Sequence, residues 1–238
     1  MMQLLVGLGN PGAQYEHNRH NVGFMAVDRI HHHWSGGPWR RKFQGEIAEA
    51  TVGGTRVMFL KPATYMNESG RSVSEAMRFY KISLGDVVIV HDEIDLAPGR
   101  FRMKTGGGTG GHNGLKSINA HIKDGYRRLR IGVGHPGRKE MVPGYVLHDF
   151  SRADGEWLDP LLDALAVEAP LLVGGKDSEY ASKVHARLAQ QGTAAKKKKV
   201  QAEAERPQPA EPLPGLGGKS AGARGASPFA ALAQFLRK

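Results

Sequence analysis

The chain is organised around the segment Leu4-Leu5-Val6-Gly7-Leu8-Gly9-Asn10-Pro11-Gly12, which leads through Tyr15 to Arg19-His20-Asn21. Its apolar residues form a run typical of a buried strand, and the glycines and proline at its end predict a turn. Apolar residues then resume at helical spacing from Val22 to Trp34. The polar insert therefore lies between a strand end and a helix start, the edge of a parallel α/β sheet where ligands usually bind.

The rest of the chain alternates between strand and helix patterns. Further strands are predicted at 41–52, 54–60, 86–91, 100–104 and 127–134, and further helices near 72–80, 115–122, 151–167 and 177–190, with 142–150 irregular. Ser72 and Glu75 have the spacing of a capping box, which predicts a helix start there. This order predicts a single-domain, three-layer α/β fold over 1–191, in which helices flank a mostly parallel mixed sheet.

A change of composition near Gln191 predicts a domain boundary. Residues 192–238 are basic and rich in Ala, Pro and Gly, with few large apolar residues, so we expect a disordered C-terminal tail. At its end, Ser227-Pro228 is placed to cap a short helix with Phe229, Leu232 and Leu236 on one face. Our hypothesis for 227–238 is a docking segment, and the alternative is a frayed end.

The composition excludes several classes of protein. There is no apolar run of about 18 residues and no secretory leader pattern, so we expect a soluble, cytoplasmic protein. The chain has no cysteine, which rules out disulfides, thiolate catalysis and cysteine-ligated metal centres.

The positive charge is unevenly distributed. The formal net charge is +10, and residues 100–139 hold ten Lys or Arg side chains but only one acid, Asp124. A focused basic surface attracts phosphate backbones, which favours nucleic acid as the partner. On charge alone, a solvated positive face explains the pattern equally well.

The glycines of the first motif also permit dinucleotide binding. Gly7, Gly9 and Gly12 match the G-x-G-x-x-G spacing after a strand, with Asp28 further along the chain. The match is poor, because Pro11 and about eight polar residues precede the helical pattern, whereas the pyrophosphate of a dinucleotide needs a helix that begins at the glycines.

Five polar residues at predicted strand ends and helix starts favour a different chemistry. They are Asn10, His20, Asn67, Asp92 and Asn113. A parallel sheet brings such positions together, and a His with an Asp is the usual composition of an oriented general base. The asparagines supply neutral donors and acceptors suited to a peptide bond or an oxyanion. The sequence leaves open whether the carboxylate or a nearby helix N-terminus controls the pKa of His20.

Several long motifs resemble the bacterial-type peptidyl-tRNA hydrolases. The matching stretches are Val6 to Asn21, Lys61-Pro62 to Gly70, His91 to Leu96, Gly106 to Leu115, and Arg128 to Pro136. The resemblance covers about residues 3–190 and implies a monomeric α/β enzyme, without metal or other cofactor, that cleaves the ester between a nascent peptide and tRNA. A non-catalytic RNA-binding protein of the same fold is the alternative.

The resemblance also implies roles for individual residues. His20 is the base that activates water, Asp92 holds it, and Asn10 distinguishes a blocked from a free aminoacyl group. The implied substrate-binding residues are Tyr15, Tyr65, Met66, Asn67, His112 and Asn113. Lys104 and Arg130 are implied to grip a terminal phosphate at the acceptor stem and 3′ end of tRNA, and Arg102, Lys116 and Arg128 are further candidates for phosphate contacts.

Two other groups invite a metal interpretation that the spacing does not favour. His31-His32-His33 lie on a predicted helix, where neighbours point about 100° apart and cannot share one ion. Asp92, Glu93 and Asp95 lie on an extended segment, where consecutive side chains face opposite ways. We therefore expect Glu93 to point away from Asp92.

Overall fold

The fold is built on one seven-stranded mixed sheet in the order β2-β3-β4-β1-β5-β7-β6. The computed structural model describes residues 2–204, and the side chains of residues 2–193. The strands are β1 (Met2–Gly7), β2 (Arg40–Lys42), β3 (Gly45–Val52), β4 (Thr55–Pro62), β5 (Val87–Glu93), β6 (Phe101–Thr105) and β7 (Arg127–Gly132). The four central strands are mutually parallel, and the outer strands add antiparallel pairs. The predicted fold class is confirmed.

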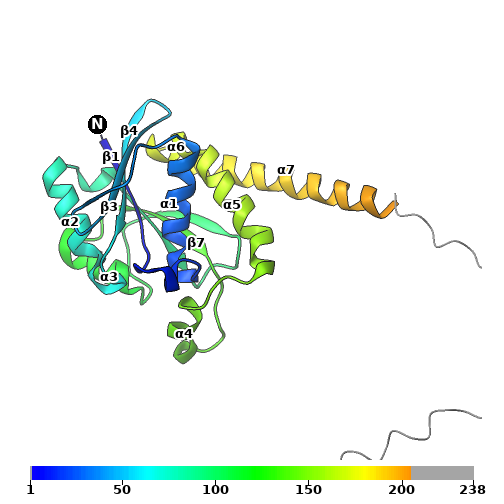
Figure 1. Ribbon diagram of the computed structural model, residues 1–238, viewed down its shortest axis with the longest axis horizontal. Helices are drawn as coiled ribbons and strands as arrows, with labels where there is room; N and C mark the ends of the chain where they lie inside the picture. Colours follow the sequence, from blue (N-terminus) through cyan, green and yellow to red (C-terminus); the bar gives the residue numbers. More distant parts are fainter. Residues whose placement is uncertain (1, 205–238) are drawn as a thin grey trace, which may run out of the picture. The chain divides into compact units, whose positions relative to one another are not determined.

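Helices cover both faces of this sheet (Figure 1). The helices are α1 (Val22–His33), α2 (Ser69–Tyr80), α3 (Asn113–Ile122), α4 (Val142–Val146), α5 (Gly155–Val167), α6 (Ala169–Val173) and α7 (Asp177–Ala204). One buried cluster joins one face of the sheet to α1, α5, α6 and the start of α7, and a second joins the other face to α2 and α3. Within the described residues, no helix combines the length and the apolar character needed to cross a membrane.

Alternation along β1 explains why this strand is the centre of the fold. Leu5 packs into the first cluster, whereas Leu4 and Val6 pack into the second, and all three are fully buried. A strand buried on both faces reads as a continuous apolar run, which is the pattern that the sequence shows. Its neighbours β4 and β5 run parallel to it, so their carboxyl ends meet at one edge of the sheet.

Two glycines of the N-terminal region allow α1 to lie unusually close to this edge. A Cβ atom at Gly7 would lie 2.4 Å from the carbonyl oxygen of Gly23, and one at Gly23 would lie 2.4 Å from that of Val90. A Cβ at Gly9 would overlap the ring of Phe24. The glycine spacing thus serves helix-sheet packing, and α1 begins only at Val22, so the dinucleotide interpretation loses its structural basis.

Gly23→Ala is expected to destabilise the protein by about 1–3 kcal/mol, because the added methyl group meets backbone atoms that cannot move independently. Thermal unfolding of the purified variant would measure the loss. Gly85→Ala is the matched control, since a Cβ there would meet no atom within 4 Å. Equal melting temperatures for the two variants would contradict this account of the packing.

Two boundaries predicted within the first 80 residues are wrong. The strand predicted at 41–52 is two strands, because Phe43 and Gln44 adopt positive φ angles of 54° and 51° and form a two-residue hairpin turn. The capping box is also absent, since α2 begins at Ser69 and Ser72 is buried inside it. The Glu75 carboxylate instead accepts a hydrogen bond from Gln44.

Differences also occur toward the C-terminal end. The stretch predicted to be irregular contains α4, and the short helix α6 was not predicted. Helix α7 runs beyond its predicted end at 190 to Ala204, because the Ala, Lys, Gln and Glu residues there are good helix formers. The docking hypothesis for 227–238 concerns residues outside the described range. The division into a domain at 1–191 and a tail stays a prediction.

Candidate active site

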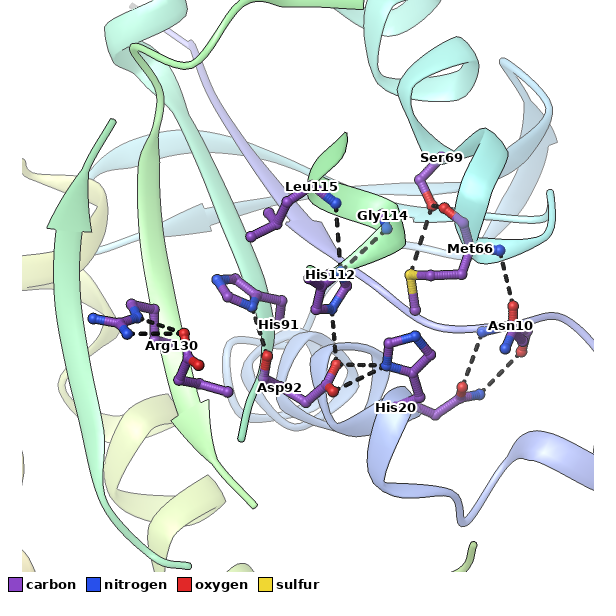
Figure 2. A network of polar contacts seen from close by, with 12 residues as sticks. Asn10, His20, Met66, Ser69, His91, Asp92, His112, Gly114, Leu115 and Arg130 are labelled. Atoms are coloured by element: carbon purple, nitrogen blue, oxygen red, sulfur yellow. Dashed lines mark hydrogen bonds and ion pairs between the residues drawn. The ribbon is translucent and has the colours of Figure 1, made fainter. Parts of the chain in front are cut away.

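The centre of the site is a direct contact between His20 and Asp92. His20 lies in a 3₁₀ turn (Arg19–Asn21) that leads into α1, and Asp92 lies at the carboxyl end of β5. The His20 Nδ1 atom is 2.8 Å and 2.9 Å from the two carboxylate oxygens (Figure 2). Because an ionised carboxylate only accepts, Nδ1–H donates, and the neutral ring keeps its Nε2 lone pair for another partner. Both residues are buried.

A second imidazole, that of His112, fixes the same carboxylate. Its Nε2 is 2.9 Å from Asp92 Oδ1, and its Nδ1 accepts hydrogen bonds from the backbone N–H groups of Gly114 and Leu115 at 3.1 and 3.4 Å. Since Nδ1 caps the start of α3 as an acceptor, the proton of the neutral ring lies on Nε2 and points to Asp92. The sequence did not reveal this contact of His112 with Asp92, since the family resemblance implied only that His112 binds substrate.

The electrostatics of this cluster follow from burial and from these contacts. Burial alone would raise the pKa of Asp92, but the charges and hydrogen bonds of His20 and His112 hold it well below its ordinary value. Burial disfavours the imidazolium form of His20, yet the charge and the hydrogen bond of Asp92 together raise the pKa of His20 above 6.5. Asp92 therefore stays ionised and controls when His20 becomes a base.

His91 is a further buried histidine that sequence reasoning did not assign. Its Nδ1 is 2.7 Å from the backbone oxygen of Asp92, and its ring meets the His112 ring edge-on at 5.1 Å between centroids. Complete burial, followed by the charge of His112, lowers the pKa of His91 to about 3. A neutral His91 therefore packs beneath the cluster without adding charge to it.

The side chain of Asn10 is held rigidly beside His20 (Figure 2). Its Oδ1 accepts from the backbone N–H of Met66 at 2.8 Å, and its backbone exchanges two hydrogen bonds with the side chain of Asn21, at 2.9 and 3.0 Å. With Oδ1 engaged, Nδ2 is the group left to donate to a ligand. Asn21 is a supporting residue that sequence reasoning missed, although it adjoins His20 in the first motif.

The other predicted substrate residues differ in exposure. Met66 is buried, and a Cβ at Gly114 would lie 2.6 Å from its sulfur, so the Met66 side chain packs against the start of α3. Asn67 and Asn113 are exposed, at the starts of a 3₁₀ turn and of α3. Tyr15 is half-buried and Tyr65 is exposed. No hydrogen bond between described residues joins the side chains of these asparagines and tyrosines to His20 or Asp92.

The predicted phosphate-binding residues fall into two groups. Lys104, Arg102 and Lys116 are exposed, and Arg130 is half-buried with its guanidinium bonded to Glu93. Arg128 is only 2% exposed and donates to the backbone oxygens of Gly107 and Gly108, both at 2.7 Å. The suggestion that Arg128 meets phosphate is therefore wrong, because its guanidinium anchors the glycine-rich loop from inside.

Two groups of residues can be tested as metal sites. His20, Asp92 and His112 offer ligand atoms within 4.8 Å of one another. Hydrogen bonds from the two imidazole rings to the Asp92 carboxylate already explain why these atoms lie close together. His31, from the histidine triplet, bonds through Nε2 to the backbone oxygen of Gly37 at 2.8 Å. The expected orientation of Glu93 is confirmed, since it contacts Arg130 whereas Asp92 contacts His20.

An open cavity of about 1400 Å³ lies along the outer face of α1. Asn10 and Asn21 are among its lining residues, whereas His20, Asp92 and His112 are not. Its lining includes an ion cluster in which Lys61 contacts Asp28 at 2.8 Å and Glu46 at 3.4 Å. The cavity therefore adjoins the site. The candidate active site is identified by its hydrogen-bond network and not by this cavity.

Comparisons with known proteins agree with this geometry. The family model described as "Peptidyl-tRNA hydrolase" matches residues 4–195. A peptidyl-tRNA hydrolase from Rhodospirillum centenum is 59% identical over 183 residues, covering 77% of this chain and 81% of the relative. One from Bradyrhizobium diazoefficiens is 56% identical over 191 residues, covering 80% and 95%. The crystal structure of peptidyl-tRNA hydrolase from Acinetobacter baumannii is 40% identical, with a TM-score of 0.73, covering 77% of this chain and 94% of that one. The chain belongs to the peptidyl-tRNA hydrolase family.

Proposed function

We propose that the chain, as a peptidyl-tRNA hydrolase, cleaves the ester between a peptide or N-blocked aminoacyl group and tRNA with His20 as the general base. The observation that carries the proposal is the contact of His20 Nδ1 with both oxygens of Asp92, which leaves Nε2 available to take a proton. Burial of the pair excludes bulk water and strengthens the contact. We assign the roles of the individual residues on this geometry.

The reaction needs no covalent intermediate. Nε2 of His20 takes a proton from water while the water oxygen bonds to the ester carbonyl carbon, giving a tetrahedral oxyanion. Collapse of this species breaks the bond between the carbonyl carbon and the ribose oxygen, and the His20 imidazolium returns its proton to that oxygen. The products are a peptide with a free carboxylic acid and a tRNA with a free ribose hydroxyl. Asp92 stabilises the imidazolium throughout.

Asn10 is suited to bind the substrate carbonyl. Because Oδ1 accepts from Met66, the amide is turned so that Nδ2 donates, and a donor of fixed position stabilises an oxyanion without reorganisation. The family resemblance supports Asn67 and Asn113 as further substrate-binding residues, together with Tyr15, Tyr65 and Met66. We further propose a monomeric enzyme that acts in the cytoplasm, where tRNA is used in translation.

The test is release of peptide from an N-acetylated aminoacyl-tRNA. We expect the purified full chain to release the acetylated amino acid and to leave the free aminoacyl-tRNA uncleaved. The alternative of a non-catalytic RNA-binding protein predicts binding of the same substrate without release. Presence of the complete His20, Asp92 and Asn10 network favours the enzyme.

Lys104 and Arg130 are proposed to bind a phosphate at the acceptor stem and 3′ end of tRNA. Lys104→Ala and Arg130→Ala are each expected to weaken tRNA binding and to reduce the slope of log K against log salt by about 1, since each removes one phosphate contact. Binding titrations at several salt concentrations measure both effects. Lys183→Ala, in an exposed position on α7, is the control. An unchanged slope for both variants would show that these side chains face solvent in the complex.

A further inference from the structure

The proposed phosphate site contains a carboxylate that opposes it. Glu93 Oε2 accepts hydrogen bonds from Nε and Nη2 of Arg130, at 2.9 and 2.8 Å. Both side chains are largely shielded, with 21% of Arg130 and 13% of Glu93 exposed. The other oxygen of Glu93 accepts from the backbone N–H of Asp95 at 3.2 Å. The carboxylate is thus fixed by the chain and cannot simply turn away when an anion arrives.

The sheet register explains this arrangement. His91 on β5 lies beside Arg130 on β7, and Glu93 follows two residues later on the same face of β5. Asp92, between them, points the other way and holds His20. Figure 2 shows Arg130 beyond His91, on the side away from His20. The phosphate site and the catalytic pair therefore take one carboxylate each from consecutive residues of a single strand.

We propose that Glu93 tunes the affinity for tRNA by weakening the binding of the tRNA phosphate to Arg130. The inference rests on the proposed role of Arg130. Glu93 occupies the edge of the guanidinium formed by Nε and Nη2, so an incoming phosphate can bind only at the end that carries Nη1. The charge of Glu93 also cancels the charge of Arg130, so the ion pair as a whole attracts the phosphate less than a free arginine would. A phosphate at that end also lies close enough to the carboxylate to be repelled by it.

Such weakening has a clear use in this reaction. Hydrolysis of the ester does not change the tRNA phosphates, so any contact to them is equally strong in substrate and product. Contacts of that kind do not accelerate the chemical step, but they slow the release of product. An unopposed arginine would hold deacylated tRNA on the enzyme. Glu93 lowers the affinity for substrate and product together and so favours turnover.

Glu93→Gln tests this, because glutamine keeps an oxygen for the Arg130 guanidinium and removes only the charge. We expect the full-length variant to bind deacylated tRNA roughly fivefold more tightly at about 0.1 M salt, with most of the change in the dissociation rate. The single-turnover rate of ester cleavage should stay within about twofold of the wild type. Glu49→Gln, in an exposed pair with Arg56, is the matched control and should leave the affinity unchanged.

The outcomes separate this inference from the proposed function. If Glu93 only supports Arg130, Glu93→Gln will weaken tRNA binding, as Arg130→Gln does, and the inference is overturned. Unchanged affinity also overturns it. The tightening should disappear in the double variant with Arg130→Gln, since the effect acts through that guanidinium. If Arg130→Gln itself leaves tRNA affinity and its salt dependence intact, the proposed phosphate site fails first.

Discussion

His20→Ala is expected to lower the rate of peptide release from an N-blocked aminoacyl-tRNA by roughly a thousandfold or more, which would register as loss of turnover. General-base catalysis contributes about 10²–10⁴-fold to the rate. The Asp92 carboxylate contacts the His20 ring, so its contribution to the reaction is lost together with that ring. Among the described residues, the other imidazole that contacts the Asp92 side chain is that of His112, and both of its ring nitrogens are already engaged in hydrogen bonds. Rates under saturating and single-turnover conditions would measure the effect.

This prediction needs evidence that the variant is folded and still binds. The affinity of His20→Ala for tRNA should stay near that of the wild type, because the proposed phosphate contacts lie on β6 and β7. His33→Ala, an exposed histidine on α1, should keep full activity. A His20→Ala enzyme that still turns over would refute the mechanism, whatever the comparisons with relatives indicate.

The pairing of His20 with Asp92 was predictable because both residues follow features that a sequence displays. His20 lies in the polar insert before a helical pattern, and Asp92 ends an apolar run that can only be a buried strand. Parallel strand order then forces the two positions to the same edge. The apolar periodicity that predicts the sheet therefore also predicts that His20 and Asp92 lie at the same edge of it.

The supporting contacts were not predictable, because they depend on orientation and not on position. Nothing in the sequence shows that His112 caps α3 through Nδ1 and so presents Nε2–H to Asp92. Likewise, only the three-dimensional contacts show that Arg128 is buried beneath the glycine-rich loop while Arg130, two residues later on the same strand, pairs with Glu93.

Errors in the predicted elements have local causes. The turn at Phe43 and Gln44 takes positive φ angles without a glycine, so the usual sequence signal for a hairpin was missing. Ser72 and Glu75 have capping-box spacing, but a 3₁₀ turn at Met66–Glu68 starts the helix earlier. Neither error changes the predicted position of a site residue. In both cases the type of element, strand or helix, was predicted correctly and only its boundary was wrong.

Asp92→Asn is expected to lower the maximal rate by about 10³–10⁴-fold while changing tRNA affinity little. The reason lies in His112, whose Nδ1 is engaged by the start of α3, so that its Nε2–H needs an acceptor. The oxygen of the introduced amide would take the Oδ1 position, which both His112 and His20 contact, and the amide NH₂ group would take the Oδ2 position, 2.9 Å from His20 Nδ1, where a donor opposes the Nδ1–H tautomer. His20 would then carry its proton on Nε2, the atom that must accept one from water. Steady-state kcat and tRNA affinity, measured together, test this.

The pH dependence of the same variant gives an independent check. Because the imidazolium is inactive and the pKa of His20 is raised, wild-type kcat/KM should fall as the pH decreases through a value above 6.5. In Asp92→Asn the raising influence is lost while burial remains, so the acid limb of the residual activity should move to lower pH. A pH profile of the two enzymes at matched salt measures the shift. An unmoved acid limb would mean that Asp92 does not set the protonation of His20, and an unchanged kcat would remove the carboxylate from the mechanism altogether.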